Sequence, residues 1–269
     1  MVARVLVVAG SDCSGGAGLQ ADIKTITALG AYASCAVTAV TVQDGQAVHE
    51  IHELNPLLVE RQMECALLDV GADAIKLGML GSALTVELVA RVCERLARAL
   101  PIVLDPVFQS STHTPLLDDA GIGSLLQRLV PRVALLTPNV PEAQRLTGVK
   151  IASVEDMMRA ADAFQLMGVS AVLIKGGHLP TDQVVDLLRT ADGVQRVFET
   201  PRVDRVTRGT GCTLAAGIAA GLAEGMTLES AVGRAHDFVS EALKQPACVP
   251  GVRPPLFHAF RCAPELLSS

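Results

Sequence analysis

The stretch RVLVVAGSDCSGGAG, residues 4–18, decides the fold because an apolar run is followed at once by a glycine-rich turn. Residues 5–8 are valine-rich and continuous, which is typical of a strand buried on both faces. The turn begins at Gly10 and leads into a helical pattern that contains Asp22. A strand, a close-approach turn and a helix in this order predict the start of an α/β domain.

The same unit recurs outward along the chain. Apolar runs at residues 36–42, 74–77, 102–104, 133–136 and 171–174 each precede a polar turn marked by Gly or Pro, with helical patterns between them. Such alternation predicts a three-layer α/β fold with a mostly parallel central sheet, helices on both faces, and ligands at the carboxyl ends of the strands. Residues 184–198 break the alternation and predict a hairpin at an antiparallel edge.

Composition favours one globular domain over residues 1–269, since half of the residues (50%) are apolar. A net charge of −6 provides no basic surface, so nucleic acid is not an expected partner. The apolar runs are too short to span a membrane or to form a signal peptide. Seven cysteines without a C-x-x-C pair indicate reduced thiols. We expect a soluble, cytoplasmic protein.

The strongest candidate for chemistry is TRGTGCT, residues 207–213, which precedes an uncharged helical run of small residues. Gly209 and Gly211 permit a tight turn whose N–H groups, together with the helix N-terminus, form an anion hole suited to a phosphoryl group. Cys212 is expected at that terminus, where a lowered thiol pKa would make it a candidate general base. Alternatively, the glycines only close a loop and Cys212 only packs.

The first glycine-rich loop fits neither of two common nucleotide-binding motifs. The G-x-G-x-x-G spacing of a dinucleotide-binding fold is absent, and Gly16 and Ala17 stand where a P-loop requires Lys and Ser or Thr. The loop is instead suited to wrapping a flat small ligand, with Asp22 as a hydrogen-bond acceptor. The alternative is a plain turn beside a solvated Asp22.

Polar side chains also follow three later strands. Asp105, Asn139 and Glu142 carry the hard oxygen atoms that hold magnesium, and Lys175 supplies a point charge for phosphates. Each has a simpler alternative: Glu142, in the first turn of a helix with Pro141 at its start, complements the helix dipole unaided. His178 is interpreted as a loop histidine that satisfies backbone groups.

Taken in order, several segments resemble the signature series of the hydroxymethylpyrimidine kinases. They are the first glycine-rich loop, KLGML at residues 76–80, DPV at 105–107, Asn139-x-x-Glu142, KGGH at 175–178 and GTGCT at 209–213. The resemblance runs from about residue 5 to residue 222. It implies a ribokinase-like fold, a homodimer, and the use of ATP and Mg²⁺ to phosphorylate 4-amino-5-hydroxymethyl-2-methylpyrimidine and then its monophosphate, for thiamin diphosphate synthesis.

The resemblance also implies roles for individual residues. The pyrimidine pocket would contain Gly10, Asp22, Gln43 and Met79, and the catalytic anion hole Gly209, Thr210, Gly211 and Cys212, with Cys212 as a base or as part of the hole. ATP would contact Lys175, Thr207 and Asn139, and magnesium would contact Asp105 and Glu142.

The chain departs from the pattern of that family at residues 44–46, 108–114 and 250–255, where it reads DGQ, FQSSTHT and PGVRPP. These departures concern the cover over the phosphates, the substrate range and the second phosphorylation more than the fold. Two other functions therefore stay open: a pyridoxal or pyridoxine kinase of the same fold, and a sensor that binds the pyrimidine without phosphorylating it.

Overall fold

The computed structural model describes residues 1–110, 112–203, 207–245, 249 and 253–261. One nine-stranded sheet runs through them in the order β3-β2-β1-β4-β5-β6-β7-β8-β9. The strands are β1 (Arg4–Asp12), β2 (Tyr32–Gln43), β3 (Val48–Glu53), β4 (Ala74–Leu77), β5 (Ile102–Leu104), β6 (Leu135–Leu136), β7 (Ala171–Ile174), β8 (Gln183–Thr190) and β9 (Gln195–Pro201).

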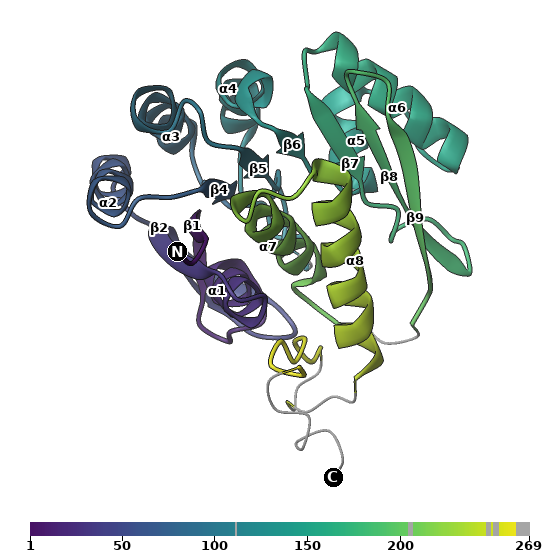
Figure 1. The fold of residues 1–269 in the computed structure, drawn as a ribbon, viewed down its shortest axis with the longest axis horizontal. Helices are drawn as coiled ribbons and strands as arrows, with labels where there is room; N and C mark the ends of the chain where they lie inside the picture. Colours follow the sequence, from purple (N-terminus) through teal and green to yellow (C-terminus); the bar gives the residue numbers. More distant parts are fainter. Residues whose placement is uncertain (111, 204–206, 246–248, 250–252, 262–269) are drawn as a thin grey trace.

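Helices cover both faces of this sheet (Figure 1). One face is covered by α2 (Pro56–Asp69), α3 (Ala83–Leu96), α4 (Asp119–Arg128), α5 (Val140–Thr147) and α6 (Val154–Leu166). The other is covered by α1 (Gly18–Ala28), α7 (Thr210–Ala223) and α8 (Leu228–Lys244). Along β1, Leu6 and Val8 pack into the first layer while Val5 and Val7 pack into the second, because successive strand residues point to opposite faces. The three-layer prediction is confirmed.

Strand pairing agrees with most of the sequence-based predictions. Strands β2, β1, β4, β5, β6 and β7 pair in parallel. The predicted hairpin is β8 and β9, which pair antiparallel. The predicted run at residues 133–136 shrinks to the two residues of β6, and β1 extends past residue 8 to Asp12, with a shift of its register with β2 around Gly10.

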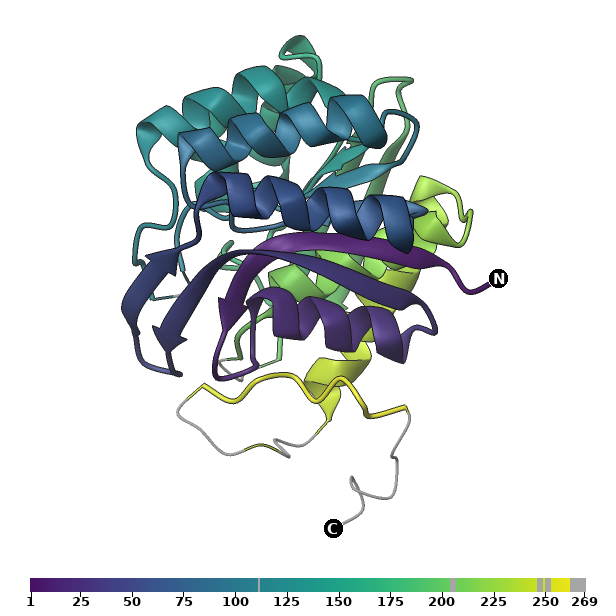
Figure 2. The same ribbon diagram turned by 90° about the vertical axis from the view of Figure 1, so that its left-hand side faces the viewer.

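The prediction missed β3, which pairs antiparallel with β2 at the other edge of the sheet. Its sequence, VHEIHE, contains no buried residue, so it lacks the apolar run by which buried strands are recognised. Figure 2 shows β2 and β3 projecting together beyond the helices that flank them. The end of β2 forms one wall of the space at the carboxyl end of β1, with Thr41 and Gln43 lining it.

Local signals in the sequence fix the starts of two helices. Asn55 caps α2 by accepting a hydrogen bond from the Leu57 N–H, with Pro56 as the first helical residue. Ser153 and Asp156 form a capping box at the start of α6. Within the part of the chain that the structure describes, no helix is long and apolar enough to cross a membrane.

Candidate active site

Two cavities meet at the carboxyl edge of the parallel strands. The larger has a volume of about 570 Å³ and the smaller about 380 Å³. They share a set of lining residues drawn from the ends of β6 and β7 and from the start of α7, namely Asn139, Lys175, His178, Thr207, Thr210 and Gly211. A ligand in either cavity would therefore contact the same six residues at the junction.

The larger cavity brings together three of the four residues predicted to contact the heterocycle. Gly10, Gln43 and Met79 all line it. A Cβ on Gly10 would lie 2.9 Å from the Met79 sulfur, so the Met79 side chain lies close against the bare backbone there. Residues 108–110, 112 and 113 line another side, with His113 in the left-handed region at φ 64°. An amide, a thioether and a bare backbone surface are suited to a flat, polar heterocycle.

Asp22, the fourth predicted contact, does not line either cavity. Its side chain is fully buried on α1 and accepts a hydrogen bond of 2.7 Å from Lys76 Nζ. Lys76 lines the larger cavity, so Asp22 lies behind the cavity wall and supports it. The solvated alternative for Asp22 is also wrong. Sequence reasoning assigned Lys76 no role, although a lysine inside the apolar run at residues 74–77 was a usable signal.

A second lysine–aspartate pair lies under the anion loop, residues 207–212. Lys175 Nζ donates to Asp105 Oδ1 at 2.7 Å, and the Thr137 hydroxyl donates to the same oxygen at 3.2 Å. Burial alone would raise the pKa of Asp105, but the charges of Lys175 and Lys76 hold it below its ordinary value. A Cβ on Gly211 would lie 3.1 Å from Lys175 Nζ, so the glycine brings the loop backbone directly over the ammonium group.

Asn139 and Glu142 form the capping box of α5. Asn139 Oδ1 accepts from the Glu142 N–H at 2.9 Å, and Glu142 Oε2 accepts from the Asn139 N–H at 2.7 Å. The capping alternative is therefore confirmed, yet both residues also line the larger cavity. Burial raises the pKa of Glu142 to about 7, partly offset by the nearby Lys175.

Magnesium fits this donor set only as a partly hydrated ion. Among the described residues no cluster of three or more His, Cys, Asp or Glu side chains forms a self-sufficient metal site. The larger cavity does contain the carboxylates of Asp105 and Glu142. Because Mg²⁺ typically uses one or two protein carboxylates together with water and substrate phosphates, two are enough.

The anion loop begins α7 as predicted. Gly209 is the N-cap at φ 82°, and a Cβ there would lie 1.9 Å from the Gly16 carbonyl oxygen, so the position requires glycine. The first N–H groups of a helix have no partner within the helix. The N–H groups of residues 210–212 lie in the first turn of α7, at the junction of the cavities. The positive end of the helix dipole favours an anion there.

Cys212 has a thiol pKa opposite to the prediction. Burial raises it to about 11, and the carboxylates of Asp22 and Asp105 add to the rise, while Lys76 and the Gly18 N–H offset only part of it. The prediction of a lowered pKa was wrong because it considered the helix terminus alone. The fold brings the sulfur near the carboxylates of Asp22 and Asp105, which are far from Cys212 in the sequence.

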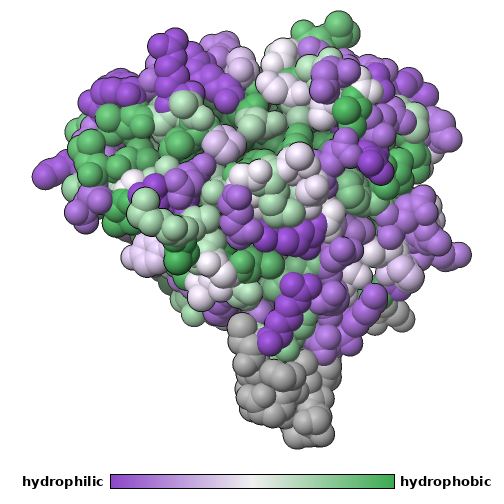
Figure 3. Space-filling model, in the orientation of Figure 1, coloured by the Kyte–Doolittle hydropathy of each residue, from purple (hydrophilic) through white to green (hydrophobic). Residues whose placement is uncertain are grey.

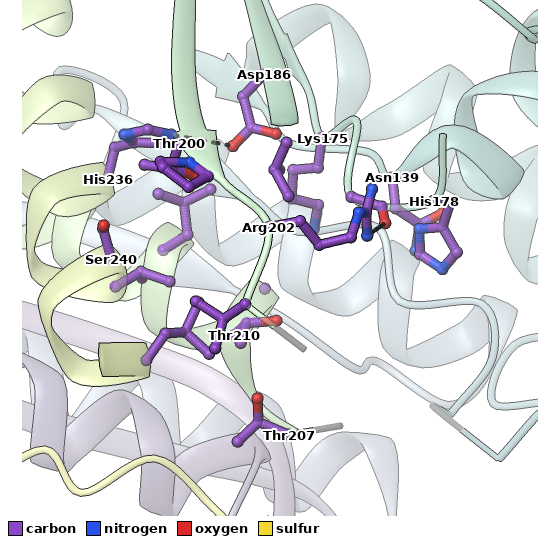
Figure 4. Close-up of a pocket in the computed structure, with 18 residues that line it drawn as sticks. Asn139, Lys175, His178, Asp186, Thr200, Arg202, Thr207, Thr210, His236 and Ser240 are labelled. Atoms are coloured by element: carbon purple, nitrogen blue, oxygen red, sulfur yellow. Dashed lines mark hydrogen bonds and ion pairs between the residues drawn. The ribbon is translucent and has the colours of Figure 1, made fainter. Parts of the chain in front are cut away.

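The smaller cavity lies between the β8–β9 hairpin and helices α7 and α8 (Figure 4). Asp186 accepts a 2.9 Å hydrogen bond from the Gly176 N–H, burial raises its pKa, and His236 Nε2 lies 4.0 Å from its other oxygen. The remaining walls are mainly apolar, contributed by Val184, Pro201, Leu214, Val239 and Leu243. Lys175, Thr207 and Asn139 line this cavity as well, but sequence reasoning missed Asp186, His236 and the apolar walls, which come from β8, β9, α7 and α8 and form no motif.

Two histidines without a predicted catalytic role also fall at informative places. His178 lines both cavities at their junction. His258 is buried and shares a 2.9 Å hydrogen bond with the Thr213 hydroxyl, behind the anion loop. Of the three segments that depart from the predicted pattern, residue 111 and residues 250–252 lie outside the described part of the chain.

Comparison with known proteins agrees with this geometry. The sequence model of the family described as phosphomethylpyrimidine kinase matches residues 12–254. The hydroxymethylpyrimidine/phosphomethylpyrimidine kinase of Haemophilus influenzae is 39% identical over 249 residues, which cover 91% of this chain and 92% of that protein. A thiamine biosynthesis bifunctional protein of Geobacter sulfurreducens is 42% identical over 241 residues, 89% of this chain, but this chain spans only 49% of its length.

Solved structures of two kinases share the fold of this chain. The phosphomethylpyrimidine kinase of Clostridium difficile has a TM-score of 0.79 at 34% identity, covering 90% of this chain and all of that one (100%). The pyridoxal kinase of Staphylococcus aureus in complex with AMP-PCP and pyridoxal has a TM-score of 0.87 at 34% identity, covering 96% and 94%. The fold is thus ribokinase-like, and the chain belongs to the phosphomethylpyrimidine kinase family.

Proposed function

We propose that this chain transfers the γ-phosphoryl group of ATP to the hydroxymethyl group of 4-amino-5-hydroxymethyl-2-methylpyrimidine, and then to the resulting monophosphate, in thiamin diphosphate synthesis. The observation that carries the proposal is the meeting of two cavities at Lys175 and the start of α7. A transfer between two substrates requires a separate site for each and a common point at which the phosphoryl group passes. The family match supports the same reaction.

The pyrimidine would occupy the larger cavity. Gln43 offers both an amide donor and an acceptor to the ring nitrogens and the exocyclic amine, and Met79 covers the ring with its thioether. Lys76 adds a buried positive charge close to Cys212. We therefore expect Asp22 to act on the pyrimidine through Lys76 and not by direct contact.

The nucleotide would occupy the smaller cavity, with its base between the hairpin and α8 and its phosphates toward Lys175, Thr207 and Asn139. The mainly apolar walls with a few convergent polar groups are typical of a site for a planar ring. Magnesium would be held by Asp105 and Glu142 and would screen the phosphate charge. The ADP and AMP-PCP complexes of structurally similar kinases support the use of ATP.

In the transfer step the hydroxymethyl oxygen forms a bond to the γ-phosphorus while the bond to the β,γ-bridging oxygen breaks. The hydroxyl proton passes to solvent water, and the departing group is ADP. Little covalent chemistry is required of the protein, because phosphoryl transfer depends mainly on positioning and on charge stabilisation. Residues 209–212 would supply N–H groups and Lys175 an ammonium group at the phosphoryl oxygens, and Cys212 would serve in this hole as a neutral thiol.

The two alternatives are less well supported. Pyridoxal kinases give high structural similarity, with a TM-score of 0.87 at 34% identity, but the family model that matches residues 12–254 is that of phosphomethylpyrimidine kinase, and the Haemophilus influenzae pyrimidine kinase is 39% identical. A sensor would not need Lys175, Asp105 and the anion loop to converge at one junction. Comparing kcat/KM for the pyrimidine and for pyridoxal separates these readings, and a large preference for pyridoxal would overturn the thiamin assignment.

Product identification tests the function itself. The chain is incubated with the hydroxymethylpyrimidine and MgATP, and the products are weighed by mass spectrometry. We expect the monophosphate first and the diphosphate later. Binding without any phosphorylated product would favour the sensor and contradict the proposal.

We also propose that residues 1–269 act as one domain, in the cytoplasm, as a homodimer. Exposed leucines at Leu57, Leu58 and Leu68 of α2 and at Leu84 of α3 support an association surface, and Figure 3 shows hydrophobic residues gathered over these two helices. Sedimentation at micromolar protein concentration tests the dimer.

A further inference from the structure

Arg208, the residue before Gly209, has no role in the transfer described above. Its side chain is only 7% exposed and lies between three loops that surround the larger cavity. Nη1 donates to Asp12 Oδ2 at 3.3 Å and to the Asp44 carbonyl at 3.4 Å, and Nη2 donates to the Ser14 hydroxyl. One guanidinium group thus joins the anion loop to the first glycine-rich loop and to the end of β2.

Asp12 is the acceptor on the other side of this contact. Its carboxylate, 1% exposed at the end of β1, accepts the N–H groups of Gly16 at 3.0 Å and Ala17 at 2.8 Å. Burial alone would raise the pKa of Asp12, but hydrogen bonds from Ser14 and Gln43 and the charge of Arg208 hold it below its ordinary value. Asp12 is therefore ionised at neutral pH and fixes the shape of the glycine-rich loop.

The two loops are also in direct backbone contact. A Cβ on Gly16 would lie 2.7 Å from Arg208 Nε, so the guanidinium rests flat against that peptide. A Cβ on Gly209 would collide with the Gly16 carbonyl oxygen at 1.9 Å. Because both positions are glycine, the first glycine-rich loop and the anion loop can approach closely, and the Asp12–Arg208 pair then sets their relative position.

Stability alone is a poor explanation for this pair. A buried ion pair contributes little net stability, because both charges lose their hydration. Within the described part of the chain Arg208 Nε has no hydrogen-bond partner, which adds to the cost. The pair instead lies where the glycine-rich loop and Gln43, which would hold the acceptor, approach the anion loop, which would hold the donor.

We infer that Asp12 and Arg208 are a positioning pair, which sets the distance between the hydroxymethyl oxygen of the acceptor and the phosphoryl group at residues 209–212. The inference rests on the proposed function. Misplacement by about 1 Å lowers the rate of an enzyme by about 10²-fold. Loss of the pair should therefore lower kcat while each substrate still binds, since neither residue provides the main contact to either ring.

The test compares Arg208→Met, Asp12→Asn and the double variant with wild type, using kcat and KM for both substrates. We expect each single variant to lower kcat about 10- to 100-fold with KM changed less than about 3-fold. The double variant should be no slower than the worse single variant, because the residues act as a unit. Millimolar guanidinium should restore part of the activity of Arg208→Ala.

Arg4→Met is the matched control. Arg4 is the first residue of β1, at the end opposite to Asp12, and pairs with Asp73 at 2.8 Å. Neither Arg4 nor Asp73 lines the larger or the smaller cavity. We expect its kcat to equal that of wild type. Thermal unfolding identifies any variant that fails to fold, in which case Arg208→Lys replaces it and should retain the charge but not the geometry of the fork.

Wild type is assayed with the hydroxymethylpyrimidine and with pyridoxal, and the variants are compared on the substrate that it phosphorylates. An inactive wild type would overturn the proposed function. An active wild type with unchanged kcat in Arg208→Met, or with additive losses in the double variant, would overturn the positioning pair alone. Loss through KM only would assign Arg208 to binding and would also contradict it.

Discussion

Lys76–Asp22 and Lys175–Asp105 are two lysine–aspartate pairs with the same 2.7 Å contact, and they differ in almost everything else. The side chains of the first pair are 1% and 0% exposed, whereas Lys175 is 14% exposed at the junction of the cavities. Asp22 Oδ1 has no hydrogen-bond partner among the described residues, while Asp105 also accepts the Thr137 hydroxyl. In the first pair the carboxylate is sealed behind the lysine, whereas the second pair lies at the junction of the two cavities.

The carboxylates respond to their surroundings in opposite directions. Burial raises the pKa of Asp22 to about 6 even though Lys76 opposes it. The pKa of Asp105 is lowered against the effect of burial, because two lysines lie near it. The comparison shows that a contact distance does not define a role: we assign Lys76–Asp22 to supporting the wall, and Lys175–Asp105 to holding a charge ready for phosphate.

The largest effect should come from breaking the Lys76–Asp22 pair. Lys76→Met leaves Asp22 buried without a counter-charge, and we expect the free energy of unfolding to fall by about 3–5 kcal/mol. Urea unfolding at pH 7 measures it. The double variant Lys76→Met/Asp22→Leu removes both charges and should recover much of the loss. A single variant as stable as wild type would contradict the assignment.

Breaking the Lys175–Asp105 pair should affect catalysis more than stability. Lys175→Gln removes a cation from the phosphate junction, and we expect kcat/KM to fall by about 10²- to 10³-fold. The free energy of unfolding should change less than in Lys76→Met, because Asp105 keeps Thr137 and the nearby charge of Lys76. Lys150→Gln, on an exposed residue, is the control. Near wild-type turnover in Lys175→Gln would remove the proposed role.

The two carboxylates should also differ in their pH dependence. The folded pKa of Asp22, about 6, lies above its ordinary 3.8, so its contribution is complete below pH 3.8 and is lost as pH rises through 6. The contribution of Asp105, whose pKa is lowered, is complete above its ordinary value and is lost only as pH falls below it. Between pH 4.5 and 6.5, therefore, Asp22→Asn should flatten the dependence of unfolding free energy on pH, whereas Asp105→Asn should leave that slope unchanged.

A smaller effect is expected from Cys212→Ala. A general base contributes about 10²- to 10⁴-fold to a rate, but burial raises the pKa of this thiol to about 11. We expect kcat to fall less than about 10²-fold, because the backbone N–H of residue 212 remains in the anion hole. Cys35→Ala, on an exposed cysteine, is the control. A loss above 10³-fold would restore the role of a base.

The sequence predicted those features that depend on local order. Continuous apolar runs identified the parallel strands, and the polar residues that follow them, Asp105, Asn139 and Lys175, do meet at one edge because parallel strands end together. Strand β3 was not predicted, because none of its residues is buried. The role of Asp22 could not be predicted, because it depends on a contact with Lys76, 54 residues away.

The same limit explains the other differences. The helix start beside Cys212 was predicted from seven consecutive residues, but the pKa of its thiol depends first on burial and then on the charges of Lys76, Asp22 and Asp105, which lie far away in the sequence. The smaller cavity requires β8, β9, α7 and α8 to pack together before any site exists. Residues that follow strands could be assigned in advance, whereas those whose surroundings are built from distant segments could not.

The most direct test is a crystal structure of the chain with AMP-PCP and the hydroxymethylpyrimidine together. We predict the base of the nucleotide in the smaller cavity, the pyrimidine against Met79 in the larger one, and the terminal phosphate within hydrogen-bond distance of Lys175 Nζ and of the N–H groups of residues 209–212. A triphosphate bound away from the start of α7, or a pyrimidine in the smaller cavity, would contradict the account.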